Sequence, residues 1–238
     1  SQLKMYPTLF DFFAKEYISR HSNDYGMHYD WNETLEITDP LSFSTTDSLK
    51  LSKDYTANND LVFPLFYALE KLHSEQKRFE LYAEWQMTRI EFVTNAYSGA
   101  EKDNLNRQAL LRLENELYTR NSGAVTLVAY KRAGRLFRET SSYNWQSNTA
   151  PAENNRLALA IIRKALDRFP KAGGSDNLIQ LEKEIKATSV DLSVKTEIIP
   201  EQPFLLNLAY RNTSKVALKI YHVERMDQRQ NTNPLKNL

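Results

Sequence analysis

The hydrophobic pattern of this 238-residue chain changes its period near residue 190. In earlier segments, such as residues 105–117, apolar residues recur every three or four positions among charged residues, which predicts amphipathic helices. In residues 190–198 and 204–210 apolar and polar residues alternate, which predicts β-strands. The pattern therefore predicts an α+β chain that is mainly α, with antiparallel helical hairpins followed by a short antiparallel β-sheet segment.

The change of period also predicts two domains, a helical-hairpin domain at residues 1–189 and a partial antiparallel β domain at residues 190–238. The helical domain contains an irregular arm at about residues 22–59, in which Asp39-Pro40 is one turn signal. An irregular stretch of this length is unusual inside a compact domain. The aromatic residues of the arm, among them Trp31 and Phe43, favour an ordered arm that wraps another surface.

Three strands are expected in the second domain, the third at residues 216–220. Three strands with one apolar face are marginally stable alone. The tail at residues 224–238 is polar and contains no pattern for a fourth strand. We therefore expect that the chain only begins this β domain and is a fragment of a longer protein.

One helix resembles the second helix of a tetratricopeptide repeat. That repeat has a small residue, a bulky residue, a second small residue and a final proline at fixed spacing. Here these positions are Ala158, Ile162, Ala165 and Pro170. The following segment has Gln180 where a glycine or alanine is expected, and the hairpins are spaced more widely than the ~34 residues of the repeat. We therefore expect degenerate tetratricopeptide-like hairpins and no regular array.

The composition excludes several classes of function. The chain has no cysteine, so a disulfide framework, a cysteine-ligated zinc and a thiol nucleophile cannot form within it. The 31 Lys and Arg residues are balanced by 30 Asp and Glu residues, whereas nucleic-acid binders usually carry a basic excess. No apolar run approaches the ~20 residues of a membrane span. We expect no nucleic-acid partner and no membrane contact within this segment.

No enzyme signature is found in the sequence. The histidines have no spacing typical of metal ligands, and they are His21, His28, His73 and His222. The sequence contains no Gly-x-Ser-x-Gly motif and no glycine-rich phosphate loop. We expect a protein that is not an enzyme, without catalytic residues, cofactor or metal. An enzyme remains open only if the arm assembles a site around His21 and His28.

Two groups of residues form a candidate interaction surface. Lys131, Arg135 and Arg138 recur at helical spacing as a basic stripe, which could contact an anionic partner or be a solvated face balanced by nearby acids. The second group is aromatic and consists of Trp31, Tyr143 and Trp145. Such residues either anchor a partner at the surface or pack in the core of helical hairpins.

The sequence from Phe204 to Val223 resembles the opening strands of a macroglobulin-like domain. In that domain a strand ending in aromatic-basic-Asn, here Tyr210-Arg211-Asn212, turns into a second strand ending in Ile-Tyr, here Ile220-Tyr221. The segment from Tyr6 to Ala14 is similar to a helix in the helical N-terminal region of large bacterial alpha-2-macroglobulin-like surface proteins. The order of helical hairpins followed by a β domain also fits that family.

The resemblance implies a non-catalytic structural or interaction segment of a large exported protein from a family of protease inhibitors or traps. It implies the periplasm or outer-membrane surface of a Gram-negative bacterium, with other domains of the parent chain and possible target proteases as partners. The family's bait region and Cys-Gly-Glu-Gln thioester have no counterpart here. Two alternatives stay open: a helical-repeat scaffold for peptide or protein binding, and a surface glycan-binding protein that uses Trp31, Tyr143 and Trp145.

Overall fold

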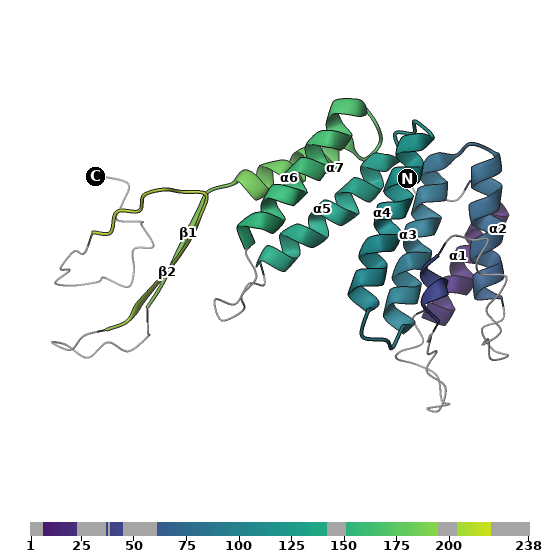
Figure 1. Ribbon diagram of the computed structural model, residues 1–238, viewed down its shortest axis with the longest axis horizontal. Helices are drawn as coiled ribbons and strands as arrows, with labels where there is room; N and C mark the ends of the chain where they lie inside the picture. Colours follow the sequence, from purple (N-terminus) through teal and green to yellow (C-terminus); the bar gives the residue numbers. More distant parts are fainter. Residues whose placement is uncertain are drawn as a thin grey trace, which may run out of the picture. The chain divides into compact units, whose positions relative to one another are not determined.

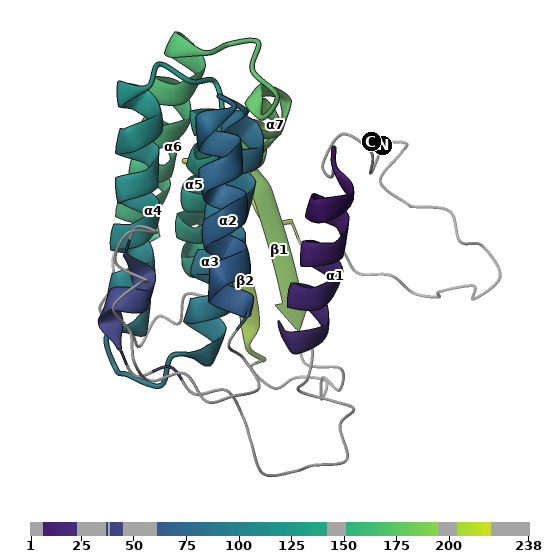
Figure 2. The same ribbon diagram turned by 90° about the vertical axis from the view of Figure 1, so that its right-hand side faces the viewer.

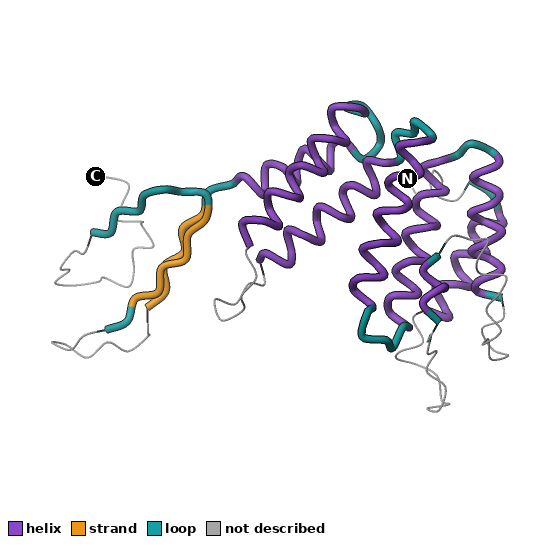
Figure 3. The backbone as a smooth tube through the Cα atoms, viewed as in Figure 1, coloured by secondary structure: helices purple, strands orange, loops and turns teal. Residues whose placement is uncertain are grey.

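The computed structural model describes residues 7–22, 37, 39–44, 61–141, 151–194 and 204–219. The chain divides into two compact units, Ser1–Ile185 and Lys186–Leu238, which are described separately. The described residues form seven α-helices and a two-stranded antiparallel sheet, which confirms the predicted α+β, mainly α, class. Figure 3 shows helices and strands by colour. Whether residues 1–189 and 190–238 fold as independent domains stays a prediction.

The first unit is a succession of helices that pack against their neighbours in the sequence. The helices are α1 (Leu9–Ser22), α2 (Val62–Glu75), α3 (Phe79–Ala96), α4 (Lys102–Thr119), α5 (Val125–Ser141), α6 (Pro151–Arg168) and α7 (Ser175–Lys186). From α2 to α6 each helix runs antiparallel to the one before it (Figures 1 and 2). α3 also touches α5, so hairpins stack on one another.

Short turns join these hairpins. The turns after α2 and α4 each contain a non-glycine residue in the left-handed region, Lys77 at φ 56° and Asn121 at φ 51°. Asparagine adopts this conformation readily, whereas a lysine there is uncommon. At both turns the backbone N–H of the following residue donates to the preceding helix, from Arg78 to His73 O and from Ser122 to Leu117 O.

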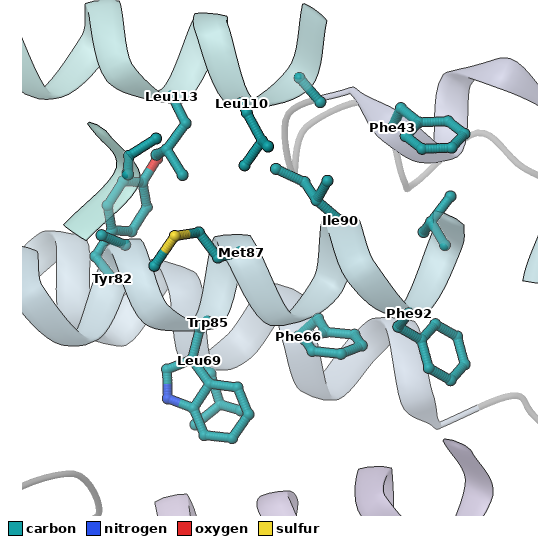
Figure 4. Packing of buried hydrophobic residues seen from close by; sticks show 14 of the residues in the cluster. Phe43, Phe66, Leu69, Tyr82, Trp85, Met87, Ile90, Phe92, Leu110 and Leu113 are labelled. Carbon is teal, nitrogen blue, oxygen red and sulfur yellow. The ribbon is translucent and has the colours of Figure 1, made fainter. Parts of the chain in front are cut away.

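The main core surrounds α3, which is buried between α2 and α4. Met87 and Ile90 of α3 face Leu110 and Leu113 of α4, while Trp85 lies on the side of α2 (Figure 4). Aromatic side chains meet edge to face in this core, as in Phe66 and Trp85 with ring centroids 6.3 Å apart.

A second core joins α5, α6 and α7, and small side chains allow the first two helices to approach closely. Its buried residues are Ala129, Ala133, Ala158, Ile162, Ala165, Leu178, Leu181 and Ile185. Three of the four positions that resemble a tetratricopeptide repeat, Ala158, Ile162 and Ala165, are therefore buried together. The relationship to that repeat stays a prediction.

Part of the expected arm is packed against the helices. Residues 40–43 form a short 3-10 helix, η2 (Pro40–Phe43), which contacts α3 and α4. Ile37 makes a parallel β-bridge with Tyr97, directly after α3. Ser22 ends α1, and Asp39 and Ser44 flank the 3-10 helix. The remaining residues of the arm lie outside the described residues.

The second unit contains one β-hairpin. Strand β1 (Ser189–Val194) pairs antiparallel with β2 (Leu206–Arg211), with Ser189 opposite Arg211 and Val194 opposite Leu206. The prediction of a third strand is wrong for residues 215–219, which form no ladder. The chain leaves the sheet at Asn212, where φ is 54° and the side-chain amide donates to Ala187 O at 3.0 Å. Residue 220 and those after it lie outside the described residues.

Candidate functional site

Buried polar side chains gather between α1, α2 and α3, next to the 3-10 segment. The five members are Asp11 of α1, Glu70 and His73 of α2, and Gln86 and Arg89 of α3. Glu70 and His73 are three residues apart, as are Gln86 and Arg89, so each pair shares one face of its helix. Glu70 meets Gln86 and Arg89 between α2 and α3, whereas His73 is directed to Asp11 of α1.

Arg89 is the centre of this cluster. Its Nε donates to Glu70 Oε1 at 2.8 Å, and its Nη2 donates to Gln86 Oε1 at 3.0 Å. Gln86 Nε2 donates in turn to Glu70 Oε2 at 2.9 Å, so both carboxylate oxygens accept a hydrogen bond. Burial raises the pKa of Glu70, and the charge and hydrogen bond of Arg89 oppose that rise.

The network extends from Gln86 to the surface through Tyr82. Gln86 Nε2 lies 3.0 Å from Tyr82 Oη, and the Tyr82 hydroxyl donates to Glu116 Oε1 of α4 at 2.7 Å. Arg120 completes the chain with a 2.8 Å ion pair to the same Glu116 oxygen. Burial raises the pKa of Tyr82, and the hydrogen bond to the Glu116 carboxylate raises it further.

Asp11 joins α1 to α2 and also caps α1. Its Oδ1 lies 2.6 Å from His73 Nε2, and both side chains are fully buried. Its Oδ2 accepts from the backbone N–H of Thr8 at 3.0 Å, while the Asp11 N–H donates to Thr8 Oγ1 at 3.1 Å. This reciprocal pair is a capping box. His73 Nδ1 is buried without a hydrogen-bond partner among the described residues.

The segment at residues 37–44 closes the network on the side of α3 and α4. Arg89 Nη1 donates to Ser42 O at 3.0 Å, and Arg112 Nη2 of α4 donates to Phe43 O at 2.9 Å. The Phe43 ring meets Tyr97 edge to face at 5.3 Å. A cleft beside Phe43, lined by Gln86 and Glu116 among others, has room for about one water molecule. The arrangement therefore holds five segments of the chain together, α1 to α4 and the 3-10 segment, and leaves little space for a substrate at this cleft.

The basic stripe lies on α5 and makes ion pairs with neighbouring helices. Lys131 Nζ is 2.7 Å from Glu91 Oε2 of α3. Arg135 pairs with Asp103 of α4 at 2.7 Å and with Glu139 of α5 at 3.0 Å. Arg138 is exposed in the last turn of α5. Acidic neighbours therefore pair with Lys131 and Arg135. The role of the stripe as an interaction surface stays a prediction.

The aromatic candidates Trp31, Tyr143 and Trp145 lie outside the described residues, as do His28 and His222. Among the described residues, the candidates that share one element are Lys131, Arg135 and Arg138 of α5. The sequence analysis does not identify the buried cluster, because charged residues on an amphipathic helix usually lie on its solvated face. The available signal was the position of Glu70 and Arg89 among apolar residues, next to Leu69 and Ile90.

No protein-family model matches the chain, and no curated protein or solved structure is significantly similar to it. In the part of the chain that the structure describes, no helix is both long and apolar enough to cross a membrane. The same residues contain no group of three or more His, Asp or Glu side chains placed to hold a metal ion.

Proposed function

We propose that this chain is a non-catalytic structural and interaction segment of a large exported alpha-2-macroglobulin-like protein. In this proposal the helical unit is a scaffold, and the β-hairpin is the first part of a β domain that other strands of the parent protein complete. The observation that carries the proposal is the composition of the two faces of the hairpin.

The register of the hairpin places all its larger apolar residues on one face. The cross-strand pairs on this face are Val190 with Tyr210, Leu192 with Leu208, and Val194 with Leu206. The exposed fractions of Val190, Leu192, Val194 and Tyr210 are 55, 48, 40 and 60%. The opposite face carries Ser, Asp, Asn, Ala and Arg.

A hairpin with such a face gains stability when another layer covers it. Two strands alone are marginal in water, and stacked sheets bury their apolar faces about 10 Å apart. A second copy of the hairpin would cover this face poorly. Its six side chains and the six of the first copy would bury less than the ~1,000 Å² of surface that a stable interface between separate chains requires. Strands of the same polypeptide are already linked to the hairpin and need to bury less area, so we propose that they cover it.

The remaining parts of the proposal rest on the sequence resemblance. They are export to the periplasm or outer-membrane surface of a Gram-negative bacterium, and contact with proteases through the parent protein. The glycan-binding alternative depends on Trp31, Tyr143 and Trp145, and no contact of the described residues favours it.

Hydrogen exchange of the hairpin amides tests the proposal. We expect weak protection of residues 189–194 and 206–211 in this chain, and strong protection of the same amides in the intact product of its gene. The α6 amides are the internal control, since α6 packs in a core formed by α5, α6 and α7 of this chain. Strong and equal protection of hairpin and α6 in this chain alone would contradict the proposal.

A pair of variants gives a second test in the intact gene product. Leu192→Asp places a charge on the apolar face and should lower expression of folded protein. Ser193→Asp places the same charge on the polar face of the same strand and should have little effect. Equal behaviour of the two variants would mean that the apolar face is not covered.

A further inference from the structure

The groove between α3 and α4 holds residues 37–44 in the way that a peptide-binding site holds its ligand. We propose that this groove is a peptide-binding site occupied by the chain's own segment. Its partner would be a peptide that presents the same turn, Asp-Pro-x-Ser-Phe, and binds when the segment lifts. This inference is independent of the proposed alpha-2-macroglobulin-like function.

The groove recognises mainly the backbone of the segment. Arg89 and Arg112 donate to the carbonyl oxygens of Ser42 and Phe43. At the other end, Ile37 N–H donates to Ala96 O at 2.9 Å, and Ser98 N–H donates to Ile37 O at 3.2 Å. Backbone contacts of this kind provide affinity with little dependence on sequence, as in strand addition to a sheet edge.

One aromatic side chain gives the recognition its specificity. Phe43 is 2% exposed and packs on Tyr97, whereas Pro40 and Leu41 of the same turn face solvent. Ser42 and Ile37 are also buried, at 2% and 7% exposed, so Phe43 is the aromatic anchor within a partly buried segment. Asp39 Oδ1 accepts from Leu41 N–H at 2.8 Å, so the turn is organised by its own residues. A short peptide can therefore form the same turn.

The groove keeps its key donor in position without help from the segment. Arg89 is fixed through Nε and Nη2 by Glu70 and Gln86, which both belong to the helices. Its Nη1 is thereby directed toward the position of the Ser42 carbonyl. Preorganised donors of this kind reduce the entropy that binding costs.

Fluorescence anisotropy with a labelled peptide of residues 37–44 tests the inference. The protein variant Phe43→Ala weakens the hold of the chain's own segment, so we expect it to bind the peptide. The wild-type chain should bind at least ~10-fold more weakly, because its site is filled most of the time. A control peptide that carries Phe43→Ala should bind the variant about 30-fold more weakly, as expected for loss of an anchor.

The variant Arg112→Gln, added to the Phe43→Ala chain, should weaken peptide binding because a backbone contact is lost. Phe43→Leu replaces Phe43→Ala if circular dichroism shows that the latter does not fold. The inference is overturned if a folded variant fails to bind the peptide. It is equally overturned if the wild-type and variant chains bind both peptides alike.

Discussion

Arg89 is a large charged side chain that is almost completely buried, and its environment explains why the protein tolerates it. Three of its nitrogens donate to Glu70, Gln86 and the Ser42 carbonyl. A buried guanidinium is costly when unpaired, and these hydrogen bonds offset part of that cost. At the residue scale the network therefore joins α2, α3 and the 3-10 segment.

Removal of the Arg89 charge should be strongly destabilising. The variant Arg89→Met leaves the Glu70 carboxylate buried without its partner, and we expect the free energy of unfolding in urea to fall by about 3–5 kcal/mol. The matched control is Arg107→Met, which breaks an exposed pair with Glu139 and should cost less than about 1 kcal/mol. A similar decrease in the free energy of unfolding in the two variants would show that the buried pair contributes no more to stability than the exposed pair does.

Glu70 should give the stability of the protein a recognisable dependence on pH. Because burial raises its pKa above the ordinary 4.5, the native state keeps this proton to higher pH than the unfolded state does. The Glu70 contribution to the free energy of unfolding is therefore highest below pH 4.5 and falls as the pH rises through the raised pKa.

The variant Glu70→Gln cannot make this titration, and urea unfolding from pH 4 to pH 8 is the measurement. We expect the wild-type free energy of unfolding to fall relative to that of the variant as the pH rises above 4.5. A difference that grows in the opposite direction would mean that Arg89 outweighs burial and lowers the pKa of Glu70.

At the scale of elements, alanines are most of the buried side chains that α5 and α6 contribute to the second core. Ala129 and Ala133 of α5 and Ala158 and Ala165 of α6 are fully buried. Gly134 of α5 also lies near α7, since a Cβ there would be 4.0 Å from Leu181. The separation of these helices is therefore determined by the smallest side chains. A larger side chain at one of these alanines would find little free space.

The variant Ala165→Leu should destabilise the helical unit by about 1–3 kcal/mol through overpacking. Ala160→Leu on the exposed side of the same helix is the control, and it should change stability by less than about 0.5 kcal/mol. Thermal unfolding followed by circular dichroism measures both. A neutral Ala165→Leu variant would show that α5 and α6 can separate without cost.

At the scale of the whole molecule, the helical unit has two buried clusters in place of one. The first cluster includes residues of α1 to α4 and the start of α5, and the second joins the remainder of α5 to α6 and α7. Stacked hairpins interact mainly with their neighbours, so parts of such an array can open separately.

Ile162→Ala should therefore weaken one part of the unit more than the other. It removes a fully buried side chain from the second cluster, at a cost of about 2–5 kcal/mol. We expect hydrogen exchange to accelerate in α6 and α7 while α2 and α3 keep most of their protection. Phe66→Ala in the first cluster is the reciprocal control. Uniform loss of protection in both variants would show that the unit unfolds as one cooperative block.

The fold class and the position where helices give way to strands could be predicted from the sequence. A period of three to four residues identifies a helix and a period of two identifies a strand, because each follows from local backbone geometry. Both patterns can be recognised from neighbouring residues alone. Examples are the stripe at Ala158, Ile162 and Ala165 and the alternation at Val190 and Leu192.

Contacts between residues far apart in the sequence could be identified only in the tertiary structure. Arg89 meets Ser42, and His73 meets Asp11 across 62 positions, because packing of helices brings them together. The sequence indicates that a charged residue is present but not whether a distant partner makes its burial tolerable. The same reason explains why residues 215–219 do not form the expected third strand. Their apolar residues alternate, but a ladder also requires a partner strand. The neighbouring strand β2 ends before Asn212.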